Sequence, residues 1–197
     1  MRFALLLLVL LVTSAPALRA APASGSEYLD RFFAFYPTRA TAAGRHDLDR
    51  SLEDLSPERR REWVSFNRRA AEGFRKVLAD PAAPFDDRLD AELQLRQAEL
   101  EILDHETLRT PERDPLYWTG LLGDATIFLL VRDDLPLDDR LQRAAARADL
   151  IPRLARQARE TLAAAAPSNV SAELCTLAVR QARASAELYR ASFPKAA

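Results

Sequence analysis

The stretch SPERRREWVSFNRRAAEGFRKVLA, residues 56–79, decides the fold class of this chain. Ser56 is a preferred helix-capping residue, and Pro57 is tolerated best at the first turn of a helix, so the pair predicts a helix start. Beyond that point the apolar residues recur at the period of a helix face. They are Trp63, Phe66, Ala70, Phe74, Val77 and Leu78. The stretch therefore predicts one long helix.

The same signals recur along the chain. We expect further helices over 24–36, 38–43, 86–108, 116–131, 137–150, 152–166 and 172–192, with a polar loop over 45–55 and a connector over 80–85. Prolines and Gly44 stand between them, where helices end. With five glycines and few β-branched residues, strands have little to build on. The sequence predicts an all-α fold, an irregular helical bundle of seven to eight helices.

The first 23 residues have the pattern of a secretory signal peptide. Arg2 precedes an uninterrupted apolar run over 3–12, and small residues then allow cleavage after Ala17 or Ala23. The run is about half as long as the roughly twenty residues that cross a bilayer, so we expect no retained anchor. The predicted arrangement is a signal peptide over 1–23 and one helical domain over 24–197, in the periplasm or secreted.

The composition excludes several classes of binding partner and of covalent or metal site. The chain has 28 basic and 29 acidic residues, a net charge of −1, without the one-sided basic surface that nucleic acids and anionic membranes require. Cys175 is the only cysteine, which excludes an internal disulfide, a thiolate zinc site and a lipid attached at the cleavage point. Its place beside Leu174 and Ala178 on an apolar helix face predicts a buried, inert thiol.

His105 and Glu106 begin like the zinc-peptidase motif H-E-x-x-H, in which two histidines one turn apart grip a metal. Arg109 occupies the second ligand position, and a fixed cation would repel the metal. The only other histidine is His46. We therefore predict no zinc site here and expect both residues to face solvent.

The loop with Asp47, Asp49, Ser51 and Glu58 has the ligand spacing of a calcium-binding EF-hand. The position that needs glycine for the sharp turn is Leu52, so we expect an acidic loop that caps a helix and not a calcium site.

Gly120 and Gly123 lie in the most apolar internal segment and lack the ending of a phosphate-binding loop. They predict close helix packing, or alternatively a bend that lines a pocket with Tyr117 and Trp118. The arginines over 59–61 and 68–69 alternate with glutamates, which is typical of a solvated helix face. No catalytic, cofactor-binding or metal-binding residue is predicted.

The order of residues along the whole mature chain carries a family resemblance. An aromatic helix is followed by Pro37, Ala40-Thr41, Gly44, His46, Asp47, Leu52, Asp54 and Ser56, then Arg88-Leu89, Leu93, Arg113-Asp114-Pro115, Tyr117, Arg132, Pro136, Arg140, Ile151-Pro152 and Leu154. This pattern resembles the N-terminal region of the large bacterial proteins grouped as domain of unknown function 885. The resemblance implies an exported, all-helical, zinc-peptidase-like protein.

The same resemblance implies that the metal site is absent from this chain. In the family, the proposed site is a histidine-glutamate pair followed shortly by proline, glycine and two histidines, in the C-terminal half. Nothing in residues 1–197 matches it, so the resemblance carries over no catalytic residue. The expectation is a truncated member, whether a fragment, a frameshifted gene or one half of a split gene.

Three functions follow as hypotheses. The first is a non-catalytic N-terminal helical region that forms a scaffold and part of a substrate cleft, with a missing C-terminal half or a peptide as its partner. The second is a stand-alone periplasmic binding or chaperone-like module with an apolar groove around Tyr117, Trp118 and Phe128. The third is a subunit that completes a split enzyme. The first predicts bare apolar helix faces; we expect one on the aromatic helix over 28–36.

Overall fold

The computed structural model describes residues 25–165 and 170–191. The predicted signal peptide and both of its cleavage points lie outside the described residues. Within them every regular element is a helix, which confirms the all-α prediction. None of these helices is both long and apolar enough to cross a membrane.

The helices follow one another as the proline and capping signals predict. They are α1 (Gly25–Phe35), α2 (Pro37–Ala42), α3 (Pro57–Ala79), α4 (Phe85–Leu103), the π-helical turn η1 (Asp104–Leu108), α5 (Thr110–Arg113), α6 (Pro115–Val131), α7 (Leu137–Ala148), α8 (Ile151–Ala164) and α9 (Ala172–Ala191). Of these described helices, seven have eleven residues or more, in agreement with the prediction. Two details differ: the helix expected over 86–108 ends in the π-helical turn, and α5 forms where a break was expected.

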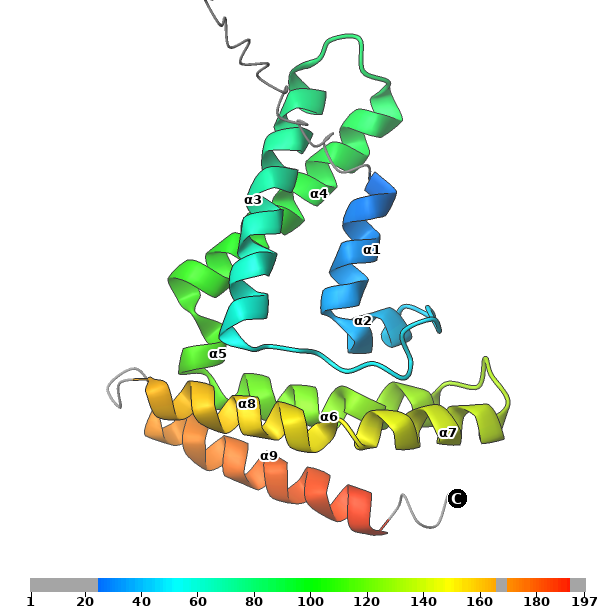
Figure 1. The fold of residues 1–197 in the computed structure, drawn as a ribbon, viewed down its shortest axis with the longest axis vertical. Coiled ribbons are helices and arrows are strands. Elements are labelled where there is room, and N and C mark those ends of the chain that lie inside the picture. The colour runs from blue at the N-terminus through cyan, green and yellow to red at the C-terminus, as the bar shows by residue number, and fades with distance from the viewer. Residues whose placement is uncertain (1–24, 166–169, 192–197) are drawn as a thin grey trace, which may run out of the picture.

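The helices form two layers (Figure 1). In one layer α3 and α4 pair as a hairpin, with α1 and α2 beside them. In the other layer α6 contacts α7, α8 and α9, and these four helices lie across the ends of α1 and α3. The irregular segment 43–56 runs along the boundary between the layers.

The apolar stripe of α3 is buried as predicted. Ser56 caps the helix by accepting a hydrogen bond from the Arg59 backbone N–H at 3.4 Å, and Pro57 occupies the first turn. Trp63 is only 4% exposed and stacks on Phe35 with 4.6 Å between the ring centroids. Residues from both layers meet around this pair in the core. The buried members are Phe35, Tyr36, Leu52, Leu55, Trp63, Trp118, Ala125, Leu154 and Ala158.

Arginines of the second layer hold the irregular segment in place. Arg147 of α7 is fully buried and donates to the Thr41 hydroxyl at 2.8 Å, the Leu48 carbonyl at 3.0 Å and the Ala125 carbonyl at 3.2 Å. Arg153 of α8 donates to the carbonyls of Leu52 and Glu53, each at 2.8 Å. Buried carbonyls need partners. Guanidinium groups donate to the carbonyls of Leu48, Leu52 and Glu53, which lie outside the helices, and the Leu48 carbonyl also accepts from the Ser51 backbone N–H at 2.9 Å.

The acidic residues of this segment are also used as hydrogen-bond acceptors. Asp49 is fully buried; it accepts from Thr41 Oγ1 at 2.6 Å, and its other oxygen lies 3.1 Å from Arg143 Nη1 and 2.8 Å from His46 Nδ1. Asp47 pairs instead with Arg45 at the surface. The loop expected to cap a helix is thus an arginine-bonded structural segment.

Helix α9 packs closely on α6, which confirms the packing interpretation of the glycines. A Cβ atom placed on Gly123 would lie 3.4 Å from Ser185 Oγ of α9. The prediction of a buried Cys175 is wrong, because the thiol is exposed. Among the described elements α9 is covered mainly by α6, so only a narrow stripe that includes Ala178 is buried, while Leu177 remains 42% exposed.

Helix α4 exposes the leucines that its sequence pattern marks as apolar. Four of them lie on one face, spaced by whole helical turns. Leu89 is 48%, Leu93 62%, Leu100 52% and Leu103 45% exposed. The opposite face is buried through Ala91 and Ala98. We call these four leucines the α4 stripe.

We expected a bare apolar face on the aromatic helix, which is α1 in the structure, and that expectation is wrong. Tyr28 is 1% exposed and Phe35 5%, because α1 packs its rings against α3. Of the large apolar residues in that helix, only Leu29 is largely exposed, at 45%.

Replacing the buried guanidinium tests how much the segment depends on it. We expect Arg147→Met to lower the free energy of unfolding by about 3 kcal/mol, because it removes the hydrogen bonds to Thr41 Oγ1 and to the Leu48 and Ala125 carbonyls, together with the buried cation that faces the Asp49 and Glu53 carboxyl groups. Urea unfolding followed by circular dichroism measures the change. The matched control, Arg183→Met on the exposed side of α9, should change stability by less than about 0.5 kcal/mol. A loss below about 1 kcal/mol for Arg147→Met would contradict the role assigned to this side chain.

Candidate functional site

A buried polar cluster lies where α1, α3 and α4 meet. Its centre is Glu101, which is 4% exposed. One carboxylate oxygen accepts from the Tyr36 hydroxyl at 2.6 Å and from Trp63 Nε1 at 2.8 Å, and the other accepts from Gln97 Nε2 at 2.7 Å. His105 lies one turn further along, with Nε2 3.4 Å from the Tyr36 hydroxyl oxygen and 3.9 Å from Glu101. Three donors thus satisfy a carboxylate that burial would otherwise destabilise.

The π-helical turn η1 places His105 in this cluster. The Arg109 N–H donates to the Asp104 carbonyl, five residues back, at 2.7 Å, and Arg109 has the left-handed backbone conformation with φ 54°. The wider turn directs His105 toward α3 and leaves Glu106 at the surface. His105 is only 9% exposed, so the expectation that it faces solvent is wrong, whereas that expectation holds for Glu106. Turns of this kind are frequent at functional sites.

Burial sets the protonation of the cluster. It lowers the pKa of His105 below 6.5, although the charges of Glu101 and Asp104 act in the opposite direction. Burial, together with Glu101, raises the pKa of Tyr36 well above its ordinary value. Tyr36 therefore stays protonated, and its hydroxyl donates a hydrogen bond to Glu101. The Tyr36 oxygen can in turn accept a hydrogen bond from a protonated Nε2 of His105. In that tautomer Nδ1 is an acceptor. It is buried and has no hydrogen-bond partner among the described residues.

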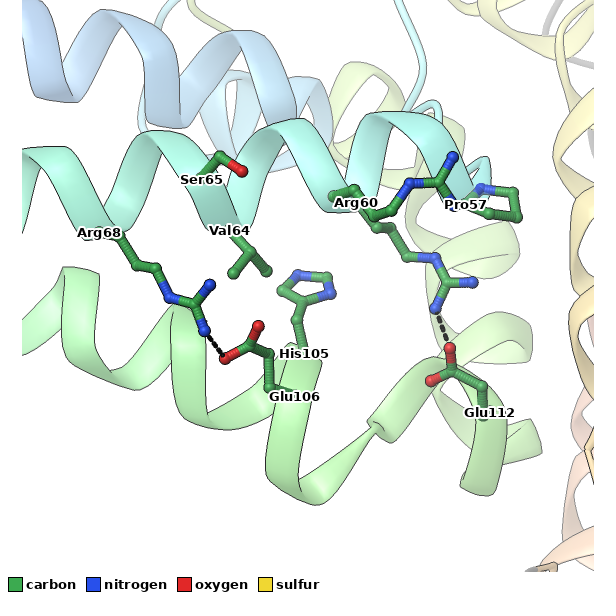
Figure 2. Close-up of a pocket in the computed structure, with 9 residues that line it drawn as sticks. Pro57, Arg60, Val64, Ser65, Arg68, His105, Glu106 and Glu112 are labelled. Atoms are coloured by element: carbon green, nitrogen blue, oxygen red, sulfur yellow. Dashed lines mark hydrogen bonds and ion pairs between the residues drawn. The ribbon is translucent and has the colours of Figure 1, made fainter.

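His105 forms part of the wall of a pocket of about 430 Å³ between α3, η1 and α5. Figure 2 shows its ring between two ion pairs, Arg68 with Glu106 and Arg60 with Glu112. The Arg68–Glu106 distance is 2.5 Å. The remaining lining residues are Pro57, Arg61, Val64 and Ser65. The pocket therefore combines a neutral imidazole with guanidinium and carboxylate groups.

A second pocket of about 420 Å³ adjoins the first and shares Pro57, Arg60 and Glu112 with it. Helix α8 provides its other wall. The additional charged lining residues are Arg109, Arg153, Arg156 and Glu160. We call the two joined pockets the α3–α8 groove.

The residues expected to form an apolar groove lie elsewhere. Trp118 is 1% exposed and donates from Nε1 to the Pro111 carbonyl at 2.7 Å, and Tyr117 packs against the same core. Neither lines the α3–α8 groove. The expectation of a groove around Tyr117, Trp118 and Phe128 is therefore wrong for Trp118, whose ring is a core side chain.

The sequence interpretation paired His105 with the wrong neighbour. It considered Glu106 and Arg109, while the contact in the structure is with Glu101, four residues earlier. A glutamate one turn before a histidine on a helix was the available signal. Over residues 25–165 and 170–191, no three histidine, cysteine, aspartate or glutamate side chains come together as a group that could hold a metal ion.

The lowered pKa of His105 gives a pH dependence with a definite sign. Because the folded chain binds this proton more weakly than the unfolded one, its stability should fall as the pH drops from about 7 to 5. Urea unfolding at both pH values should show a larger loss for the native chain than for His105→Gln, which has no imidazole to titrate. An equal loss in both chains would show that His105 does not titrate in this way.

The comparisons with known proteins agree with this fold. The profile of a family of bacterial proteins of unknown function (DUF885) matches residues 37–197. A solved structure of a candidate lipoprotein of unknown function from Shewanella oneidensis is similar, with a TM-score of 0.66 and 22% sequence identity, over 82% of this chain. The chain spans 28% of the length of that protein. No curated protein matches it.

The family match covers most of the described helices, from α2 through α9, and the similar structure supports the fold independently. The chain belongs to the family of bacterial proteins of unknown function named DUF885.

Proposed function

We propose that this chain is a non-catalytic helical region that acts as the N-terminal scaffold of an exported, zinc-peptidase-like protein and forms one wall of its substrate cleft. The α4 stripe carries the proposal. The signal-peptide pattern of residues 1–23 supports export. The α3–α8 groove is the candidate for the cleft wall.

The α4 stripe has the properties of a packing surface. Its leucines are between 45% and 62% exposed, and Leu108 of η1 is 49% exposed at the end of the same hairpin arm. Full burial of one leucine side chain is worth about 1.5–3 kcal/mol relative to full exposure, so a covering partner would stabilise this helix considerably. Apolar clusters of this kind on a surface mark interaction sites.

The occupant that we propose for the stripe is the remainder of a family-length protein. This chain covers 28% of the Shewanella protein, so a homologue of that size has a much larger part outside the matched region. Scaffold and remainder must share an interface in such a protein. Among the described helices, α4 offers the longest run of exposed leucines for it.

Accessibility of a thiol introduced into the α4 stripe tests the scaffold role. The chain would carry Leu93→Cys with Cys175→Ser, encoded at the natural locus, and a small maleimide would be added to permeabilised cells. If the stripe is covered, the thiol of the Leu93→Cys chain should react at least roughly tenfold more slowly in cells than in the purified chain. Mass spectrometry of the labelled peptide measures the rate.

The matched control is Arg183→Cys in the same Cys175→Ser background, because Arg183 lies on the exposed side of α9. This control thiol should react equally fast in cells and in the purified chain. Equal rates for the Leu93→Cys thiol in both settings would refute the scaffold role and favour a stand-alone binding module.

A further inference from the structure

We infer that the α3–α8 groove binds an extended peptide segment with acidic side chains. The inference deepens the proposed function, on which it rests only for the placement of the groove in a substrate cleft. Three observations carry it: the charge of the groove, the polar atoms in its wall that have no hydrogen-bond partner among the described residues, and the division of its cations between two adjoining pockets.

The α3–α8 groove is basic, although the chain as a whole is not. Its two pockets are lined by six arginines and three glutamates, whereas the whole chain has a net charge of −1. Arg61, Arg109 and Arg156 have no carboxylate within 4.0 Å among the described residues, and all three are exposed. Within residues 25–165 and 170–191, Arg153 donates only to backbone carbonyls. Four guanidinium groups thus lack an acidic partner in these described ranges, which favours an anionic ligand.

The wall also contains buried polar atoms that have no hydrogen-bond partner in the described part of the chain. They are His105 Nδ1, Arg60 Nε, Arg153 Nε and Glu112 Oε2. The His105 side chain is 2% exposed, and its ring lies between the two ion pairs of the first pocket. Native proteins leave few such atoms unsatisfied. A ligand that enters the pocket can donate to Nδ1 and Oε2 and accept from the arginines.

A peptide offers both hydrogen-bond donors for the unpartnered nitrogen and acceptors for the arginines. Backbone N–H groups can donate to His105 Nδ1, and side-chain carboxylates can pair with the guanidinium groups. Arg61 lines the first pocket, and Arg109 and Arg156 line the second, so guanidinium groups without an acidic partner among the described residues lie in both of the adjoining pockets. Cations separated in this way suit several separated carboxylates better than one compact anion.

The test uses the purified full chain and two synthetic peptides of six residues, one alternating glutamate and glycine and the other alternating glutamine and glycine. Calorimetry measures binding. NMR of the imidazole nitrogens reports on the site directly, because His105 and His46 are the only histidines. We expect the glutamate peptide to bind and to shift the Nδ1 signal of His105, with an affinity that falls as salt is added. The glutamine peptide should not bind measurably.

Two double variants distinguish binding at the groove from a general effect of the positive charge of the chain. Arg61→Gln with Arg156→Gln should weaken binding of the glutamate peptide about tenfold or more, because two cations of the groove are lost. Arg180→Gln with Arg183→Gln removes the same charge from the exposed side of α9 and should leave the affinity unchanged. All four positions are exposed, so each variant should fold, as circular dichroism will check.

The outcomes distinguish this inference from the scaffold proposal. Equal affinity for both peptides, no binding of either peptide, or equal weakening by both double variants would overturn the inference. Binding of inorganic phosphate without the glutamate peptide would also overturn it, since the groove would then hold a compact anion. A protected thiol in the Leu93→Cys chain without peptide binding leaves the scaffold role intact. Peptide binding with a freely reactive thiol in that chain refutes the scaffold and keeps the groove as a ligand site.

Discussion

The structure depends on the hydrogen bonding of an irregular segment that lies between two layers of helices. Residues 43–56 form neither helix nor strand, yet Asp49, Leu52 and Leu55 within them are buried. A buried backbone without regular structure is stable only if its carbonyls find donors. Arg147 and Arg153 provide those donors from the second layer, and in doing so they connect α7 to α2 and connect both α7 and α8 to the irregular segment. The arginines therefore act as packing residues more than as surface charges.

The candidate site lies within the first layer. Tyr36 and Trp63 both donate to Glu101 of α4, and the carboxylate is satisfied inside the core. The π-helical turn after α4 then directs His105 into the remaining space, with one nitrogen facing Tyr36 and the other without a partner among the described residues. The neutral imidazole thus lies between the ion pairs Arg68–Glu106 and Arg60–Glu112, and Arg61 of the same pocket has no carboxylate within 4.0 Å among the described residues.

Helix α4 connects the site to the proposed scaffold role. Its buried face contributes Ala91, Ala98 and Glu101 to the first layer, while the α4 stripe faces away from both layers. A helix with apolar residues on both faces is typical of one that lies inside a larger body. The exposed stripe and the groove flank the same hairpin, so a covering partner on α4 would lie near the wall of the groove.

The sequence by itself determined the helices, because proline, capping residues and a 3.6-residue period act locally; Ser56-Pro57 marks the start of α3 at the residue where the structure begins it. It also indicated the family, by the order of dispersed residues. It could not determine which face of α4 is buried, since leucines and alanines occupy both faces and the amphipathic signal is weak. Nor could it reveal that His105 is buried: its environment is set by a π-helical turn and by Tyr36, 69 residues away, and both depend on long-range packing. The tertiary structure alone decided these points, because burial is a property of neighbours that are distant in sequence.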